Sequence, residues 1–247
     1  MRLTVIGSAG TFPGPESPCA SYLVEQDGFR LLLDLGSGAV GALQRYHPTG
    51  NVLDVDTVLL SHLHGDHWLD LIPYAYARSY APNGRAQRLT VFSPPGLAKR
   101  LTSLGTTTVC EAYELNTLPP GPVSLGPFQV AFARTAHPVE CYAMRLTAGG
   151  RTLVYSADTG PCAELVTLAR GADTLLCEAS NADGEQHPPR LHLTGRQAGE
   201  HAAQAGVGRL VLTHIVPYVD PARTRSFAAE AYPGPIELAA PGASYDI

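Results

Sequence analysis

The sequence has little of what marks several common classes of protein. Its five cysteines are scattered without a C-x-x-C pair, so we expect reduced, buried thiols rather than disulfides or a thiolate zinc cage. Its seventeen Lys and Arg residues form no dense run and the net charge is −5, which argues against a broad nucleic-acid surface. No signal-peptide pattern and no apolar run long enough for a bilayer are present, so we expect a cytoplasmic protein with no membrane partner.

The apolar content, 45% of 247 residues, is sufficient for a sizeable core, and we predict a single globular domain over 1–247. Strand-like runs alternate with helical patterns, which predicts an α/β fold, and the β-rich opening and hairpins favour mixed sheets. The expected strands are 3–6, 20–24, 29–33, 57–60, 89–93, 109–115, 128–135, 142–147, 151–155, 173–177 and 209–213, and the expected helices are 39–46, 68–79, 96–104, 161–170 and 194–205.

A dense cluster of metal-binding side chains follows the predicted strand 57–60. The sequence of residues 61–67 is Ser-His-Leu-His-Gly-Asp-His. His62 and His64, two residues apart at a strand end, can reach one ion, and Asp66 and His67 lie past the turn at Gly65 and suit a second ion. The alternative is a polar loop in which Asp66 caps a helix. The density of imidazoles favours metal binding.

Other polar residues follow predicted strands in the same way. They are Asp34, His137, Asp158, Glu178 and His214. Because strand ends converge on ligand sites in α/β proteins, we expect these side chains near the cluster. For Asp34 we favour a role in bonding its own turn or orienting a ligand histidine over direct ligation.

Several further residues have weaker signals. Tyr74, Tyr76 and Tyr80 could stack a base in a pocket, but their helical spacing favours the core. We expect His47, His187 and His201 at the surface, because no motif or strand end accompanies them. The polar stretch 180–190 is the best candidate for a mobile loop.

The order His-x-His-x-Asp-His, a later His, Ser-Ala-Asp-Thr and a last His resembles the metallo-β-lactamase superfamily over nearly the whole chain. This resemblance implies a four-layer αββα sandwich with two mixed β-sheets and two metals at the edge between them. Residues His62, His64 and His137 would then hold one metal, Asp66, His67 and His214 the other, and Asp158 would bridge both. Zinc fits this nitrogen and oxygen ligand set best, with manganese as the alternative.

Within the superfamily, the second half is similar to the ribonuclease Z and phosphodiesterase branch. The segments that resemble it are 154–159, 175–179, 192–198 and 212–214. The resemblance implies that His192, in His-Leu-Thr-Gly-Arg-Gln-Ala, is a catalytic residue that does not bind metal, and Glu178 could orient it. Only twenty residues separate His137 from Asp158, so the long tRNA-gripping arm of ribonuclease Z enzymes is missing.

The expected protein is therefore a metal-dependent hydrolase, a phosphodiesterase for a small diester such as a cyclic nucleotide. A hydroxide bridging the two metals would attack the phosphorus, Asp66 would accept a proton, and His192 would donate one to the leaving oxygen. The main alternative is a ribonuclease Z-like tRNA 3′-processing endonuclease acting on RNA. Other ester, lactone or thioester hydrolases and a non-catalytic binding module fit less well. The resemblance also implies a homodimer.

Overall fold

The computed structural model describes residues 1–247 except 83, 85, 105–106 and 185–190. Its strands form two seven-stranded sheets. The first sheet has the order β14-β1-β2-β3-β4-β5-β6 and contains β1 Arg2–Gly7, β2 Ser21–Gln26, β3 Phe29–Leu33, β4 Thr57–Leu59, β5 Leu89–Ser93, β6 Tyr113–Thr117 and β14 Ser244–Asp246. The second has the order β13-β12-β11-β10-β9-β8-β7 and contains β7 Val123–Leu125, β8 Phe128–Arg134, β9 Tyr142–Ala148, β10 Arg151–Tyr155, β11 Thr174–Glu178, β12 Leu210–Thr213 and β13 Ile236–Leu238.

Both sheets are mixed, as the hairpin signals predicted. In the first sheet β1, β2 and β3 pair antiparallel, and β3 through β6 pair parallel. In the second, β7 through β10 pair antiparallel and β10 through β13 parallel. The β2–β3 hairpin turns at Asp27 and Gly28, whose φ angles of 50° and 80° suit a tight two-residue turn.

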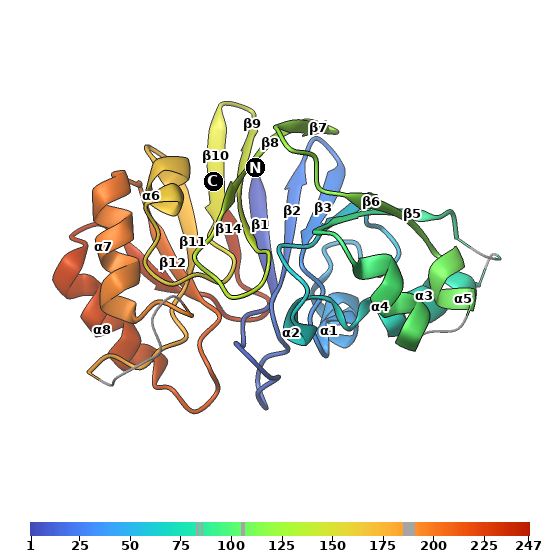
Figure 1. Cartoon of the computed structure of the whole chain (residues 1–247), viewed down its shortest axis with the longest axis horizontal. Coiled ribbons are helices and arrows are strands. Elements are labelled where there is room, and N and C mark those ends of the chain that lie inside the picture. The colour runs from blue at the N-terminus through green and yellow to red at the C-terminus, as the bar shows by residue number, and fades with distance from the viewer. Residues whose placement is uncertain (83, 85, 105–106, 185–190) are drawn as a thin grey trace.

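Helices cover the outer face of each sheet. The first sheet is accompanied by α1 Ala39–Tyr46, α2 Gly65–Trp68, α3 Leu71–Ser79, α4 Leu97–Leu104 and α5 Thr107–Glu111, and the second by α6 Ala163–Ala169, α7 Gly195–Ala205 and α8 Pro221–Ala231. Figure 1 shows α6, α7 and α8 on one side of the paired sheets, with α1, α3, α4 and α5 on the other.

The side chains of β3 explain how the layers are held together. Leu31 and Leu33 point between the two sheets, and Leu32 points to the outer helices, because successive side chains of a strand alternate in direction. One apolar cluster therefore lies between the sheets and a further cluster under each helical layer. This is the predicted four-layer αββα sandwich of the metallo-β-lactamase fold.

Two predicted elements differ from the structure. The expected helix 68–79 starts later, as α3 at Leu71, and Trp68 is instead the last residue of α2, because Pro73 in a continuous helix would clash with the carbonyl of Leu69. The helix restarts at Leu71, so that Pro73 falls in its first turn, where it is tolerated. The expected strand 109–115 was wrong over its first half, since α5 extends to Glu111 and β6 begins at Tyr113. Tertiary packing of Val109 in the core outweighs its preference for strands.

Candidate metal centre

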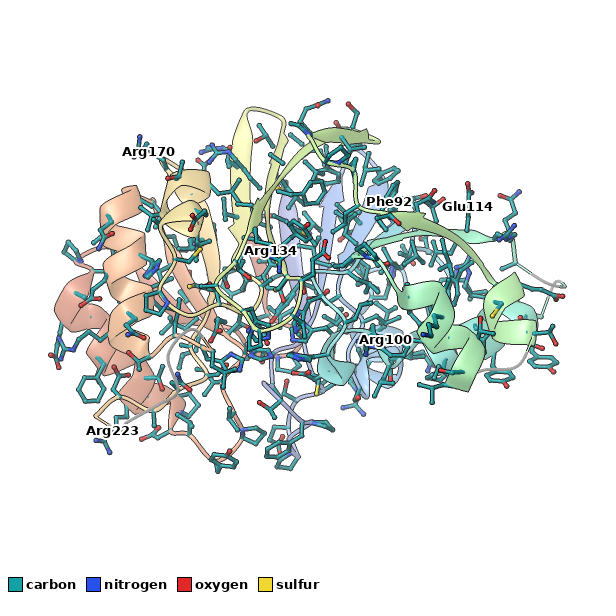
Figure 2. The ribbon with its side chains drawn as sticks, viewed as in Figure 1. Phe92, Arg100, Glu114, Arg134, Arg170 and Arg223 are labelled. Atoms are coloured by element: carbon teal, nitrogen blue, oxygen red, sulfur yellow. The ribbon has the colours of Figure 1, made fainter. Side chains whose placement is uncertain are left out.

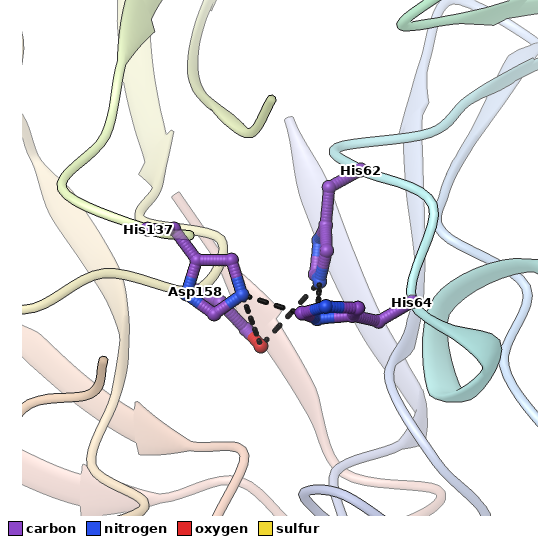
Figure 3. Close-up of side chains that lie close together, drawn as sticks. All are labelled: His62, His64, His137 and Asp158. Carbon is purple, nitrogen blue, oxygen red and sulfur yellow. Dashed lines mark hydrogen bonds and ion pairs between the residues drawn. The ribbon is translucent and has the colours of Figure 1, made fainter. Parts of the chain in front are cut away.

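Three imidazoles and a carboxylate converge in a first group of side chains. Nδ1 of His64 lies 3.1 Å from Nε2 of His62 and 3.1 Å from Nε2 of His137. Oδ2 of Asp158 lies 3.5 Å from Nε2 of His62 and 3.9 Å from Nε2 of His137 (Figure 3). Nitrogens and an oxygen placed so closely around one point match the donor set of a divalent cation.

A second group lies beside the first. Nε2 of His67 is 3.1 Å from Nε2 of His214, and Oδ2 of Asp66 is 3.1 Å from the latter nitrogen and 3.4 Å from the former. Oδ1 of Asp158 completes the group at 3.3 Å from His67 and 3.4 Å from His214. Two imidazoles and two carboxylates again surround one point.

Asp158 connects the two groups, since each of its carboxylate oxygens faces a different one. The side chain is 2% exposed, and Oδ1 has no hydrogen-bond partner among the described residues. A buried carboxylate oxygen without a partner is costly, and a cation would satisfy it. The residues therefore fit two adjacent divalent ions with one carboxylate between them.

All these side chains come from one edge of the sandwich, where strands of both sheets end. His62 and His64 follow β4, and Asp66 and His67 lie in α2, which begins at Gly65. The second sheet contributes the other three, His137, Asp158 and His214, from the ends of β8, β10 and β12. The structure thus brings together all seven residues that the sequence proposed as ligands.

The backbone turns sharply at several of these strand ends. Asp34, Ala157 and His214 have φ angles of 56°, 52° and 54°, in the left-handed region that costs a non-glycine residue about 1–2 kcal/mol. Gly10 allows a close approach to one of them: a Cβ there would lie 2.4 Å from the carbonyl oxygen of His214. Strain and close backbone contact of this kind are typical of functional sites.

Four of the five imidazoles are fixed by a hydrogen bond at the nitrogen that faces away from the centre. The pairs are His62 Nδ1 with Ser61 Oγ at 3.0 Å, His67 Nδ1 with Asp34 Oδ2 at 2.8 Å, His137 Nδ1 with the Leu191 carbonyl at 3.0 Å, and His214 Nδ1 with Ser180 Oγ at 2.7 Å. Asp34 is itself held by the hydroxyl of Tyr155, which donates to Oδ2 at 2.8 Å. Such contacts set the tautomer and direction of a ligand histidine.

His192 lies at the edge of the centre and is held by Glu178. Its Nδ1 is 2.8 Å from Oε1 of Glu178. The Glu178 carboxylate is fully buried and also accepts hydrogen bonds from the backbone N–H groups of Thr159, Ser180 and Leu193. These hydrogen bonds occupy both oxygens of Glu178, although Glu178, His192 and His214 could be grouped as possible metal ligands by distance alone.

Burial and neighbouring charges set the protonation of the site. Burial lowers the pKa of His62, His64 and His137, which favours the neutral imidazoles that bind metals. Burial alone would raise the pKa of Asp66, but the neighbouring imidazole of His67 holds that pKa well below its usual range. Burial alone would lower the pKa of His192, but the Glu178 carboxylate raises it to about 9.

A pocket of about 690 Å³ adjoins the centre on the side of the second sheet. It is lined by Thr11 from the loop after β1, by Ser180 and His192, and by Tyr218 and Arg223 from the loop after β12 and from α8. The backbone N–H of Thr11 donates to Oδ2 of Asp66 at 2.9 Å and so links the pocket wall to the proposed metal ligands.

The sequence analysis did not predict helix α8 or the part of the pocket wall that Thr11 and Tyr218 form. Thr11 and Tyr218 are single residues in irregular loops, and no motif points to them. The start of α8 does carry a signal, because Asp220 caps the helix by accepting from the N–H of Ala222 at 2.9 Å and Pro221 follows as its first residue. That pair of residues could have predicted the helix.

Two surface predictions were wrong. His47 is 4% exposed and its Nε2 contacts the Asp54 carbonyl at 2.8 Å. His201 is 6% exposed and its Nε2 accepts from the N–H of Cys162 at 3.0 Å. Both are satisfied by backbone groups, which a motif search does not detect. His187 and the end of the predicted loop 180–190 lie outside the described residues.

The tyrosines of α3 do not reach the pocket. Tyr74 is buried in the core, as expected, and its hydroxyl donates to the Val52 carbonyl at 2.7 Å. For Tyr76 and Tyr80 the expected core position was wrong, because both rings face solvent, with 36% and 76% exposure, and stack on each other with centroids 6.3 Å apart. None of the three lines the pocket beside the centre.

Comparison with known proteins gives a consistent result. Residues 29–215 match the Beta-lactamase superfamily domain. The chain is 40% identical to an uncharacterized protein of Mycobacterium leprae, over all of this chain and 89% of that protein. It is 28% identical to a ribonuclease Z of Myxococcus xanthus, over all of this chain and 98% of that enzyme.

A solved structure is also similar over the full length. The crystal structure of the metallo-β-lactamase fold protein YhfI from Bacillus subtilis superposes with a TM-score of 0.89 at 29% identity and covers 99% of each chain. The sequence comparison with the same protein gives 32% identity over 98% of both chains. Among the described residues, no helix has the length and apolar character needed to cross a membrane.

Proposed function

The chain belongs to the metallo-β-lactamase superfamily and is a metallo-hydrolase of that fold, and from this premise we propose that it hydrolyses a small phosphodiester such as a cyclic nucleotide. The observation that carries the proposal is the position of Asp158 between two groups of imidazoles. One carboxylate oxygen of Asp158 faces the first group, and the other oxygen faces the second group. A pair of divalent ions, zinc first and manganese as the alternative, would supply an activated water and neutralise the phosphoryl charge.

His192 is proposed to donate the proton that the leaving oxygen needs. Its ring centroid lies 5.5 Å from that of His137 and 5.7 Å from that of His214, so it borders both groups of side chains. Because Nδ1 donates to Glu178, a proton on Nε2 faces the pocket, and this nitrogen has no hydrogen-bond partner among the described residues. A general acid must occupy such a position.

Asp66 has a second proposed role as proton acceptor. Its Oδ2 already accepts the N–H of Thr11 and lies 3.1 Å from Nε2 of His214, so the carboxylate is fixed in direction. The neighbouring imidazoles keep it ionised, as an acceptor must be. Of the two residues proposed for proton transfer, His192 lines the pocket and Asp66 is hydrogen-bonded to the lining residue Thr11.

The size of the chain supports a small substrate. The twenty residues between His137 and Asp158 contain the β9–β10 hairpin, which leaves no segment for an RNA-gripping arm at that point. The alignment with the Myxococcus xanthus ribonuclease Z runs over 308 residues, so that enzyme carries segments that this 247-residue chain lacks. A pocket of about 690 Å³ is of the size that small-molecule ligands occupy.

The similarity to ribonuclease Z gives a second candidate, a tRNA 3′-processing endonuclease. Hydrolysis of 3′,5′-cyclic AMP and of a tRNA precursor with a 3′ extension should be measured with zinc-loaded and manganese-loaded protein. His64→Ala serves as the control that removes one proposed ligand. Cleavage of the cyclic nucleotide alone supports the phosphodiesterase; cleavage of the precursor alone overturns it in favour of the nuclease. A homodimer in the cytoplasm stays a prediction.

A further inference from the structure

Two aromatic side chains from distant parts of the chain are exposed together at the surface. The rings of Phe12 and Tyr218 have centroids 5.8 Å apart and are tilted by 34°. Phe12 is 41% exposed and Tyr218 is 81% exposed. Both belong to the few large hydrophobic residues among those described that the fold leaves accessible. Exposed aromatic surface of this kind is often a binding surface.

The loops that carry this pair are fixed to each other and to the candidate metal centre. The N–H of Gly10 donates to the carbonyl of Ile215 at 3.1 Å, and Ala9 forms a β-bridge with Ile215. Thr11, the residue before Phe12, donates its N–H to Asp66. The position of the aromatic pair relative to the centre is therefore set by backbone contacts and does not depend on long side chains.

One member of the pair, Tyr218, lines the pocket that contains His192. Tyr218 is a lining residue of this pocket, as is Thr11, so a ligand that reaches the centre through the pocket passes the exposed ring. The pocket also contains Arg223, which lies on the α8 side of the molecule (Figure 2). Within the described part of the chain, no carboxylate lies within 4.0 Å of its guanidinium, so its charge is available to an anionic ligand.

A second ring in the pocket, Phe227, is already engaged. The guanidinium carbons of Arg196 and Arg223 each lie 5.6 Å from its centroid, which occupies the ring in cation–π contacts. Within the part of the chain that the structure describes, the one aromatic ring beside Tyr218 is that of Phe12, and most of the Tyr218 surface stays open. The available stacking surface at this pocket is therefore that of Tyr218, with the ring of Phe12 beside it.

We propose that Phe12 and Tyr218 form a platform on which the nucleobase of a nucleotide stacks while its phosphate reaches the candidate metal centre. Every base has a flat π face, so stacking on an aromatic side chain adds affinity with little dependence on the base. This inference rests on the proposed phosphodiesterase function and extends it from small phosphodiesters in general to nucleotides.

The test compares two ligands that differ only in the base. Binding of adenosine 5′-monophosphate and of ribose 5-phosphate to zinc-loaded protein is measured by calorimetry, which needs no turnover. The wild-type protein should bind the nucleotide at least about fivefold more tightly, since stacking contributes that much or more per base. Tyr218→Ala and Phe12→Ala should each reduce this preference and leave the affinity for ribose 5-phosphate unchanged.

Two further variants test whether the preference for the nucleotide depends on the aromatic ring at position 218. Tyr218→Phe keeps the ring and should keep the preference. Tyr80→Ala removes a tyrosine of similar exposure, 76% against 81%, that does not line the pocket, and it should behave as wild type. Because Tyr218 is so exposed, its replacement should leave the melting temperature unchanged, which confirms that the variant is folded.

The outcomes separate the platform from the proposed function. Equal affinity of the wild-type protein for the two ligands overturns the platform, as does a preference that survives Tyr218→Ala. If cyclic AMP is hydrolysed without any preference for the base, the phosphodiesterase stands and the platform fails. If the base is preferred but no diester is hydrolysed, the platform stands and the proposed function fails.

Discussion

The carboxylate of Asp34 lies 2.8 Å from Nδ1 of His67 at the base of the site, and both side chains are fully buried. This contact fixes the ring so that its other nitrogen faces Asp66, Asp158 and His214. Asp34 follows β3, and His67 lies in α2, beyond the end of the neighbouring strand β4. Through this contact Asp34 affects the site although it is not one of the proposed ligands.

Asp34→Asn should weaken the second metal site. An asparagine keeps the shape but replaces the carboxylate, and loss of such an outer contact commonly lowers metal affinity about 10- to 100-fold. Competition with a chromophoric zinc chelator measures the effect. Asp27→Asn, the same change at an exposed turn, is the control. Unchanged zinc affinity in Asp34→Asn would show that His67 does not need this partner.

Zinc titration should give two equivalents per chain in the wild-type protein. Asp158 faces both groups of proposed ligands, and His137 faces one. Asp158→Ala should therefore weaken the binding of both zinc equivalents, and His137→Ala the binding of one. Metal content measured by atomic emission after gel filtration distinguishes the two variants. A single equivalent in the wild-type protein would contradict the proposed dinuclear centre.

His192→Asn should lower turnover about 10²- to 10⁴-fold and leave the metal content unchanged. The reason is that His192 borders the centre and is held by Glu178, outside both groups of proposed ligands. Steady-state kinetics and metal analysis of the same preparation give both quantities. Loss of an equivalent of zinc would instead make His192 a ligand.

Gly10→Ala should disturb the centre without replacing a proposed ligand, since the new Cβ would lie 2.9 Å from Nδ1 of His214. The new Cβ would lie 2.4 Å from the carbonyl oxygen of His214, and overpacking of this kind costs about 1–3 kcal/mol. Gly41→Ala, in helix α1 with open space around the new Cβ, should stabilise the protein slightly. Thermal unfolding and zinc affinity are measured for both variants. If the two variants have the same melting temperature and zinc affinity, the loop at Gly10 accommodates the added methyl group without a cost in stability.

One cysteine should react quickly with a thiol reagent in the folded protein. Cys110 is half-buried, whereas Cys19, Cys141, Cys162 and Cys177 are buried. Burial raises the pKa of these four thiols, to about 12 for Cys19, so they contain little reactive thiolate at pH 8. Titration with a disulfide reagent should therefore show one fast and four slow equivalents, and Cys110→Ser should remove the fast one.

The proposed ligands could be predicted from the sequence because four of them lie within six residues and the rest follow apolar strands. That pattern is visible in the order of the residues along the chain, and His62, His64 and Asp66 remain close to the same centre in the folded protein. The pocket could not be predicted, since Tyr218 and Thr11 become neighbours of the site only through the contact between two loops. The buried state of His201 depends likewise on a partner, Cys162, that is remote in sequence.

The two sheets are almost continuous segments of the chain, since β1 to β6 form the first and β7 to β13 the second, with β14 added to the edge of the first. Most strand pairings can therefore form within each half, but the seven proposed ligands are complete only after the halves dock. Contacts made after the folding transition state act mainly on the rate of unfolding. Bound metal should accordingly prolong the lifetime of the native protein many times over, while the time the chain needs to fold stays nearly the same.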